Sequence, residues 1–178
     1  MTATVSTWVA SLLLAQAEFP SDRGFAISEP VACRVIRGYE DYEPLAEPVI
    51  PRTEKLLIYV RSEGHQYERQ ADGYRFHLVQ DVNIRRQGEK KILWGRKRVV
   101  DYEGTSPRPP LQLYLSTTLG LVDLPPGTYE ADLIVHDRIG GGEPARRTLT
   151  FRLTDPPPTP PRSDRITDST RPTPASKR

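Results

Sequence analysis

The sequence contains little cysteine and little histidine. Its 178 residues include one cysteine, Cys33, and three histidines, His65, His77 and His136. A single cysteine excludes an intrachain disulfide and a zinc site built from four thiolates. No histidine stands at ligand spacing from another histidine or from Cys33, so the sequence predicts no metal site or cofactor. We expect each histidine to be solvated or packed at the surface.

The chain also lacks an excess of charge of either sign. It holds 25 basic and 23 acidic residues, and residues 18–154 hold twenty of each. This balance weighs against a conventional nucleic-acid-binding domain, which needs a broad positive surface. The net charge of +2 comes from residues 155–178, where five basic residues outnumber three acidic ones.

Long hydrophobic runs are absent as well. The most apolar stretch is the uncharged segment 1–17, whose central run, residues 8–15, is about half as long as a membrane-spanning helix. It ends in Ala15-Gln16-Ala17, a small-residue pattern that signal peptidase accepts. The sequence therefore predicts a signal peptide over 1–17, no stable membrane span, and export to the periplasm, the cell envelope or the extracellular space. The alternatives are a ragged N-terminus or an extra apolar element that packs on the domain.

The C-terminal segment 155–178 has the opposite composition. It contains seven of the 18 prolines and no aromatic residue. Such a segment buries too little apolar surface to offset the entropy lost on ordering, so we predict a disordered, proline-rich tail. The tail is either inert, a spacer, or a proline-rich ligand with a P-x-x-P pattern supplied by residues 157–161.

Between these ends, hydrophobic and polar residues alternate over short runs. Six runs show this clearly: 31–36, 56–61, 74–79, 111–116, 129–136 and 148–153. Residues 92–100 form a weaker seventh run. A period of two predicts half-buried strands, and the glycines within 86–89 and 139–142 predict hairpin turns. No long window has the period of an amphipathic helix. We therefore predict an all-β fold, a single two-sheet sandwich of about seven strands over 26–154.

One local motif refines this prediction. The stretch Leu124-Pro-Pro-Gly-Thr-Tyr129 leads directly into a predicted strand. It resembles the tyrosine corner of immunoglobulin-like and fibronectin-type sandwiches, in which a tyrosine hydroxyl bonds to the backbone a few residues upstream. We assign Tyr129 this structural role.

The order of several motifs resembles a known family. These motifs are Cys33-Arg-Val, Gly38-Tyr-Glu-Asp-Tyr-Glu-Pro44, Leu57-Ile-Tyr-Val60, and Leu124-Pro-Pro-Gly-Thr-Tyr129 followed by Asp137. Together they resemble an uncharacterised family of exported bacterial immunoglobulin-like β-sandwich domains, and the resemblance covers most of 31–153. It implies an immunoglobulin-like fold. It implies no catalytic residues, because the family has no assigned activity.

Few residues suggest chemistry. Cys33 lies between Val31 and Val35 on one strand face, so we expect a small buried core residue rather than a nucleophile. The sequence has no G-x-S-x-G nucleophile motif and no phosphate-binding loop. An acidic cluster, Glu40, Asp41 and Glu43, stands beside two tyrosines and predicts a solvated loop; a calcium site or a sugar-binding rim is the alternative.

The strongest local charge lies in segment 85–98. It contains seven basic residues, one acidic residue and a tryptophan that would anchor a ligand: Arg85, Arg86, Lys90, Lys91, Trp94, Arg96, Lys97 and Arg98 are the candidate binding residues. On a projecting β-hairpin they would form a positive ribbon for an anionic glycan, a nucleic acid or an acidic protein surface. The alternative is a solvated hairpin whose charges oppose aggregation.

The sequence thus predicts a non-catalytic, exported interaction or structural module. Its partner would be an unknown envelope protein or polymer, and its oligomeric state stays open. One alternative is an anionic-polymer-binding protein that uses 85–98. Another is a hydrolase whose residues are scattered in sequence, such as His77 with Glu130 or His136.

Overall fold

A computed structural model describes residues 24–156, which form strands and no helix. The predicted signal peptide and all but two residues of the predicted tail lie outside this range. Eleven strands follow one another along the chain: β1 (Ala26–Ile27), β2 (Val31–Gly38), β3 (Asp41–Pro44), β4 (Val49–Pro51), β5 (Lys55–Glu63), β6 (Glu68–Gln70), β7 (Gly73–Arg86), β8 (Ile92–Ser106), β9 (Leu113–Gly120), β10 (Gly127–Asp137) and β11 (Ala145–Thr154).

The five-stranded sheet is built around β5. One edge of β5 pairs with β9 over its whole length, from Lys55 opposite Gly120 to Ser62 opposite Leu113. The other edge pairs with β2 and, nearer the end of β5, with β1. The short strand β3 folds back on β2 and extends the sheet by one strand.

The six-stranded sheet is built around β7 and β10. β7 pairs with β8 on one edge and with β10 on the other, and β10 pairs in turn with β11. β6 pairs with the beginning of β7. β4 pairs in parallel with the end of β11, so the chain crosses between the two sheets after β3.

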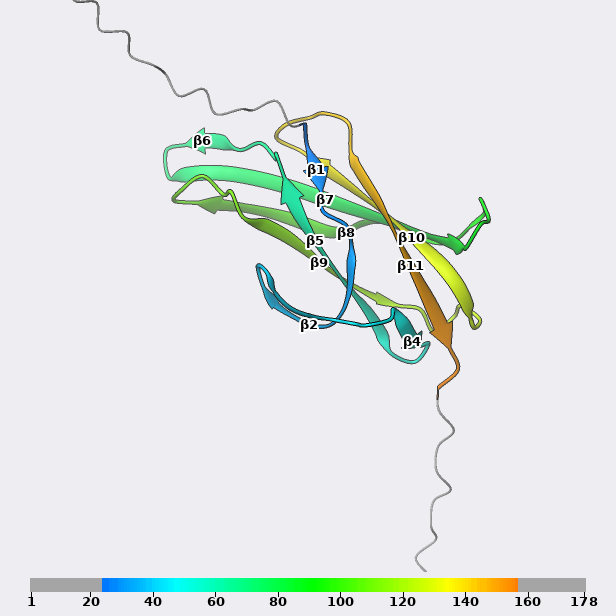
Figure 1. The fold of residues 1–178 in the computed structure, drawn as a ribbon. Coiled ribbons are helices and arrows are strands. Elements are labelled where there is room, and N and C mark those ends of the chain that lie inside the picture. Colours follow the sequence, from blue (N-terminus) through cyan, green and yellow to red (C-terminus); the bar gives the residue numbers. More distant parts are fainter. Residues whose placement is uncertain (1–23, 157–178) are drawn as a thin grey trace, which may run out of the picture.

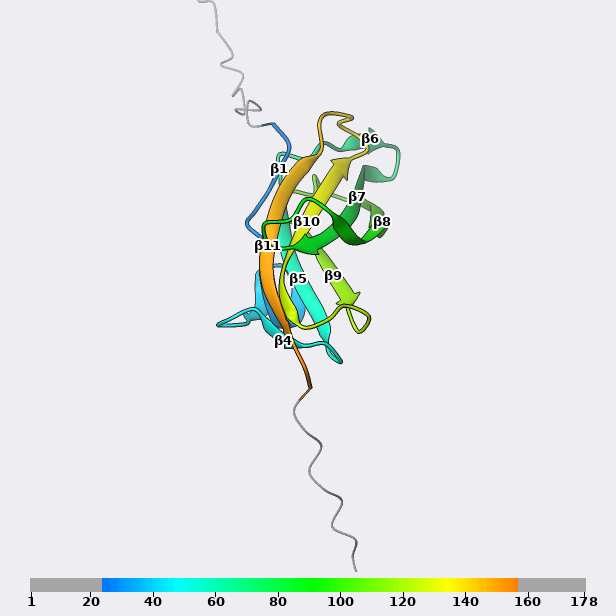
Figure 2. The ribbon, with the colours of Figure 1, turned by 90° about the vertical axis from the view of Figure 1, so that its right-hand side faces the viewer.

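The two sheets pack face to face around one core (Figures 1 and 2). Side chains alternate between the two faces of each strand because successive Cβ atoms point in opposite directions. On β9, for example, Leu113, Leu115 and Leu119 are buried while Ser116 and Thr118 are exposed. The predicted all-β, two-sheet sandwich is confirmed.

Seven of the strands have eight or more residues, and each overlaps one of the seven predicted runs. Two predictions were wrong in detail. The run at 111–116 was placed two residues too early, because Leu111 belongs to a proline-rich turn and is 74% exposed. The predicted solvated loop at 40–43 is largely strand β3, although its carboxylates are exposed as expected. No helix capable of spanning a membrane occurs in the described residues.

Candidate functional site

The basic segment 85–98 forms the end of the β7–β8 hairpin, and the structure uses part of its charge internally. Arg85 lies on the outer face of β7 and pairs with two carboxylates of β10, Glu130 at 2.7 Å and Asp132. The guanidinium of Arg86 lies over the ring of Tyr129, 5.7 Å from its centroid. These two arginines therefore fasten β7 to β10.

Two further cations of the segment are also paired. Lys97 lies 2.9 Å from Asp81, and Arg98 lies 2.6 Å from Asp101. Lys90, Lys91 and Arg96 are exposed, and none forms an ion pair with a residue in the described range. The continuous positive ribbon that the sequence suggested is thus reduced to these three cations.

Trp94 does not project from the hairpin as a free aromatic anchor. It is half-buried and packs against the sandwich core, facing the same side of the sheet as Ile84, its partner on β7. Its neighbours Ile92 and Leu93 are the more exposed apolar residues, at 54% and 38%.

A bulge in β8 organises the polar outer face of the six-stranded sheet. Between the pairs Gln80–Val100 and Val82–Arg96, β8 has three residues where β7 has only Asp81. Arg98 sits within this bulge at a φ of 51°, an uncommon conformation for a side chain of its size. The Asp81 carboxylate, 7% exposed, accepts a 2.8 Å hydrogen bond from the Arg98 backbone NH and so holds the bulge in place.

The same carboxylate gathers two more donors. Its second oxygen lies 2.9 Å from Lys97 Nζ and 3.3 Å from His136 Nε2. Burial is the largest influence and would raise the pKa of Asp81, but hydrogen bonds from Arg98, Lys97 and His136 outweigh it and leave the pKa below its ordinary value. Asp81 is therefore held as a carboxylate at the centre of the face.

His77 belongs to a neighbouring pair. Its Nε2 lies 2.8 Å from Asp101 Oδ1, and Arg98 contacts the other oxygen of the same carboxylate. The hydrogen bond with His77, followed by that from Arg98, lowers the pKa of Asp101. His77 and His136 share the outer face of adjacent strands, offset by two residues, yet each is bound to its own aspartate.

The residues proposed for a hydrolase are not all brought together. Glu130 lies opposite Arg85 on β7, eight residues along the strand from His77. At about 3.3 Å per residue this separation exceeds 20 Å, too far for a shared proton transfer. No group of three or more metal-ligating side chains occurs in the described part of the chain.

His65 corrects the prediction that every histidine is solvated or at the surface. It is only 8% exposed, with Nδ1 3.0 Å from the Ser62 hydroxyl and Nε2 against the Pro110 carbonyl. Because a carbonyl only accepts, Nε2 carries the proton and Nδ1 accepts from Ser62 in the neutral ring. The imidazole therefore ties the end of β5 to the loop before β9.

The two residues given structural roles occupy the expected environments. Cys33 is 2% exposed, and burial raises the pKa of its thiol. Tyr129 is fully buried, and its hydroxyl donates a 2.6 Å hydrogen bond to the Pro125 carbonyl, four residues upstream. The predicted hydrogen bond of the tyrosine corner is present.

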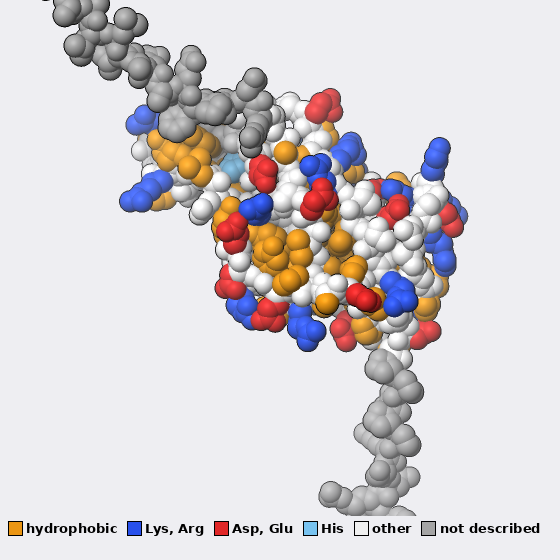
Figure 3. All heavy atoms as spheres, viewed as in Figure 1, with side chains coloured by type: hydrophobic (Ala, Val, Ile, Leu, Met, Phe, Trp, Pro, Cys, Tyr) orange, Lys and Arg blue, Asp and Glu red, His pale blue; other side chains and the backbone are white. Residues whose placement is uncertain are grey.

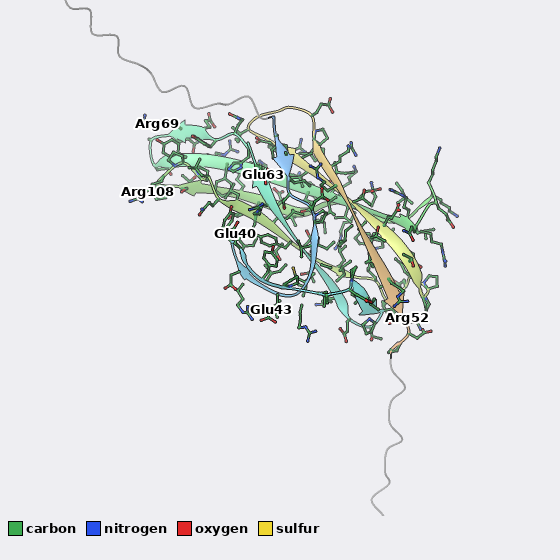
Figure 4. The ribbon with its side chains drawn as sticks, in the orientation of Figure 1. Glu40, Glu43, Arg52, Glu63, Arg69 and Arg108 are labelled. Carbon is green, nitrogen blue, oxygen red and sulfur yellow. The ribbon has the colours of Figure 1, made fainter. Side chains whose placement is uncertain are left out.

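The outer face of the five-stranded sheet carries a row of stacked tyrosines. The Tyr59 ring lies between Tyr42, at 4.3 Å between centroids, and Tyr114, at 5.4 Å. The Tyr59 hydroxyl accepts a 3.0 Å bond from the backbone NH of Glu40. This face shows an apolar patch bordered by charged side chains, with Glu40, Glu43 and Glu63 around it (Figures 3 and 4).

A groove of about 630 Å³ opens beside these tyrosines. Its charges are already paired, because Arg61 lies 2.8 Å from Glu40 and 3.6 Å from Glu63, and Arg147 lies 3.0 Å from Glu29. Arg37 likewise pairs with Asp41 and Glu43 of the acidic cluster. The cluster is thus matched by arginines, which disfavours a calcium site there.

β8 and β9 are edge strands of the two sheets and lie on the same side of the sandwich (Figure 2). A second hollow lies between them. It encloses about 270 Å³ and is lined by residues 100–102 of β8 and 114–116 of β9. Two buried polar side chains are neighbours of its lining residues. Gln80 is opposite Val100, and Thr117 is two residues beyond Leu115; neither side chain bonds to any described residue. We call this feature the β8–β9 seam.

Sequence reasoning missed the seam, the Asp81 bulge and His65, because each depends on residues that are distant in sequence. The one available signal for the seam was the uncharged run Leu113–Gly120, which contains no proline.

Comparisons with known proteins add little. No protein-family model matches the sequence, and the search of curated proteins found no match. Among solved structures, a β-glucosidase from Erythrobacter marinus is similar at 14% sequence identity and a TM-score of 0.35. The similarity covers 74% of this chain and 15% of that one. Similarity at this level carries no argument about site or activity.

Proposed function

We propose that the protein is a non-catalytic, exported interaction module with an immunoglobulin-like sandwich. The observation that carries the proposal is the strand arrangement. Strands β2, β5 and β9 oppose β8, β7, β10 and β11, and β4 crosses over to pair in parallel with β11. Immunoglobulin-like and fibronectin-type domains have this kind of Greek-key sandwich, and many cell-surface domains share it.

The tyrosine corner supports the same assignment. Tyr129 stands near the start of β10, the second-to-last strand, and bonds back to Pro125. In immunoglobulin-like domains the corresponding tyrosine closes the end of the sandwich at the same point in the strand order. The predicted signal peptide over 1–17 supports export. The resemblance to the uncharacterised exported family fits both the tyrosine corner and the signal peptide.

The polar contacts support a non-catalytic role. Asp81 and Asp101 hold the β8 bulge, Arg85 joins β7 to β10, and His65 joins β5 to a loop. Each of these ionisable groups therefore has a structural task. A catalytic site normally brings an acid, a base or a nucleophile together in a cleft.

Affinity capture tests the proposal. Residues 18–178 would be used as bait against envelope and soluble fractions, beside the same bait without residues 155–178. We expect a defined envelope protein or polymer to be enriched by both baits. Hydrolytic activity that is lost on His77→Ala would instead support an enzyme, and no enrichment from either fraction would count against an interaction module.

A second candidate function is binding of an anionic polymer by the hairpin tip. Lys90, Lys91 and Arg96 favour it, because they are exposed and have no ionic partner among the described residues. We expect retention on heparin to weaken steeply with salt and to fall further when Lys90 and Lys91 become glutamate. Retention that is insensitive to salt and to these changes would eliminate this function.

A further inference from the structure

The edge strand β9 of the five-stranded sheet lacks the features that normally protect a sheet edge. β9 pairs only with β5, and its eight residues include no charged residue and no proline. An edge strand presents unpaired NH and CO groups, and proteins normally protect such an edge with charge, proline, short length or a bulge. β9 has none of these devices.

The other edges of the sandwich are protected. β3 and β4 have four and three residues and contain Pro44 and Pro51. β8 carries the Asp81-bound bulge and several charged residues. The open part of β11 carries Arg146 and Arg147. The contrast marks β9 as the one long strand edge in residues 24–156 that is left open to pairing.

The inner face of β8, across the seam from this edge, is apolar and only partly covered. The buried leucines of β9 share one core cluster with Leu78, Val82 and Ile84 of β7, and β8 approaches β9 across the seam. β8 lies beyond β7, and its inward-facing Trp94 and Val100 are only half-buried. Tyr102, also inward-facing, remains 37% exposed. A strand placed beside β9 would therefore cover the inner face of β8.

Two buried polar side chains near the seam lack hydrogen-bond partners. Gln80 and Thr117 are 0% and 1% exposed, and the amide of Gln80 and the hydroxyl of Thr117 make no hydrogen bond to described residues. Buried polar groups without hydrogen bonds destabilise a folded core, so their presence requires an explanation. Gln80 is paired with Val100, and Thr117 follows Ser116; both of these neighbours line the hollow between β8 and β9.

The inner face of β8 carries one charged side chain, and this charge favours an acidic partner. Arg96 lies on the inner face of β8 opposite Val82 and is exposed. Its neighbours Lys97 and Arg98 are paired with Asp81 and Asp101, whereas Arg96 has no ion pair within residues 24–156. Charge complementarity therefore favours a segment with a carboxylate that reaches Arg96.

A second copy of the domain does not fit this edge. Two-fold pairing of β9 with β9 of another copy would bring that copy's six-stranded sheet against β8, which lies close to β9. A single extended segment avoids this overlap, because it brings no second sheet with it.

We propose that the β8–β9 seam binds an extended, mostly apolar and acidic segment of a partner protein, which adds to β9 as a further strand. This inference rests on the proposed interaction function and names the chemistry of the partner. Backbone hydrogen bonds to β9 supply affinity, alternate apolar side chains cover Val100 and Tyr102, and a carboxylate pairs with Arg96.

The test begins with random linear octapeptides displayed on phage and selected on the full chain. We expect enriched peptides to alternate apolar residues and to carry Asp or Glu. A synthetic copy of the most enriched peptide should slow amide hydrogen exchange at those residues of 113–120 whose NH groups do not bond to β5. Methylating alternate backbone nitrogens on the edge of the peptide that faces β9 should weaken binding at least tenfold, because it removes strand hydrogen bonds and retains the side chains.

Two charge variants make the test specific. Arg96→Glu should weaken binding of the acidic peptide at least tenfold, and replacing the peptide's carboxylate by lysine should restore it. Arg152→Glu makes the same substitution at an exposed side chain of β11, outside every proposed site, and should alter binding less than twofold. Both side chains are exposed, so neither change should unfold the domain.

Several results would overturn the inference: no enriched peptide, protection that avoids residues 113–120, or equal effects of the two charge variants. Slow exchange, in the dilute full chain without peptide, at the β9 amides that do not bond to β5 would assign the seam to a segment of the chain itself. Protection that grows with protein concentration would assign it to a second copy. Envelope partners captured equally by wild type and Arg96→Glu would leave the interaction module standing while removing the strand-addition site.

Discussion

Asp81 shows how one buried carboxylate stabilises an otherwise unfavourable backbone. It bonds to the Arg98 NH, to Lys97 and to His136, and the bulge that places Arg98 at a positive φ closes around it. Hydrogen bonds to a charged group contribute more than neutral ones, and leaving the bulge NH without a partner would cost more still.

We expect Asp81→Asn to lower the free energy of unfolding by about 1–3 kcal/mol at pH 7. Because the pKa of Asp81 is lowered in the folded state, its contribution is present above the unfolded pKa, about 3.9, and is lost as pH falls through the folded pKa. Urea unfolding at pH 7 and pH 3 should therefore show the difference between wild type and variant shrinking in acid.

Asp123→Asn is the matched control for this experiment, because Asp123 is exposed and no described residue bonds to its side chain. It should leave stability unchanged at both pH values. An Asp81→Asn deficit of the same size at pH 3 as at pH 7 would contradict an electrostatic role for the carboxylate.

Tyr129→Phe tests the tyrosine corner. The substitution removes only the hydroxyl that donates to the Pro125 carbonyl, and the ring at position 129 stays buried. We expect a loss of about 1 kcal/mol or somewhat more in urea unfolding. An unchanged midpoint would refute the structural role of this hydrogen bond.

At the scale of elements, alternation predicted the seven long strands because a period of two is visible over six or more residues. The short strands β1, β3, β4 and β6 span two to four residues, too few to show any period. The bulge between Arg96 and Val100 weakened the alternation within the predicted run 92–100. The rest of β8 was missed because residues 101–106 contain one large apolar side chain, Tyr102, and so show no alternation.

The candidate site was harder to predict than the strands. The segment 85–98 was recognisable as a basic hairpin, but its pairing with Glu130 and Asp132 depends on β10 lying beside β7. Charge composition records how many cations a segment has and not which of them face a carboxylate. The seam could not be predicted either, because it forms where the edge strands of two different sheets lie on the same side of the sandwich.

Gly73 offers a test of how tightly β6, β7 and β8 meet. It has a φ of 148°, and a Cβ added there would lie 2.5 Å from the backbone oxygen of Ser106. We expect Gly73→Ala to destabilise the protein by about 1–3 kcal/mol in thermal or urea unfolding.

Gly120, at the end of β9, is the control for Gly73. An added Cβ there meets nothing within 4 Å. Gly120→Ala should therefore change stability by less than about 0.5 kcal/mol. Equal effects of the two substitutions would show that the contact with Ser106 does not govern the outcome at Gly73.

At the scale of the whole molecule, the two sheets share one hydrophobic cluster that draws on both. A single core of this kind favours a cooperative transition, because neither sheet can keep its buried face covered alone. The hairpin tip and the seam are then parts of one folding unit.

This cooperativity can be measured with Trp94. The sequence has one other tryptophan, Trp8, so Trp8→Phe leaves Trp94 as the only one. We expect its fluorescence and the far-ultraviolet circular dichroism to change with the same midpoint in urea. A fluorescence transition at lower urea would show that the β7–β8 hairpin opens before the sandwich.

The burial of Cys33 has a practical consequence. The only thiol in the chain is 2% exposed, with its pKa raised by burial, so under native conditions it should react slowly with maleimides. A cysteine introduced at an exposed position would then be labelled selectively, with the native residue left in place. Spectroscopic distance measurements across the seam and the hairpin tip become possible in an otherwise unmodified protein.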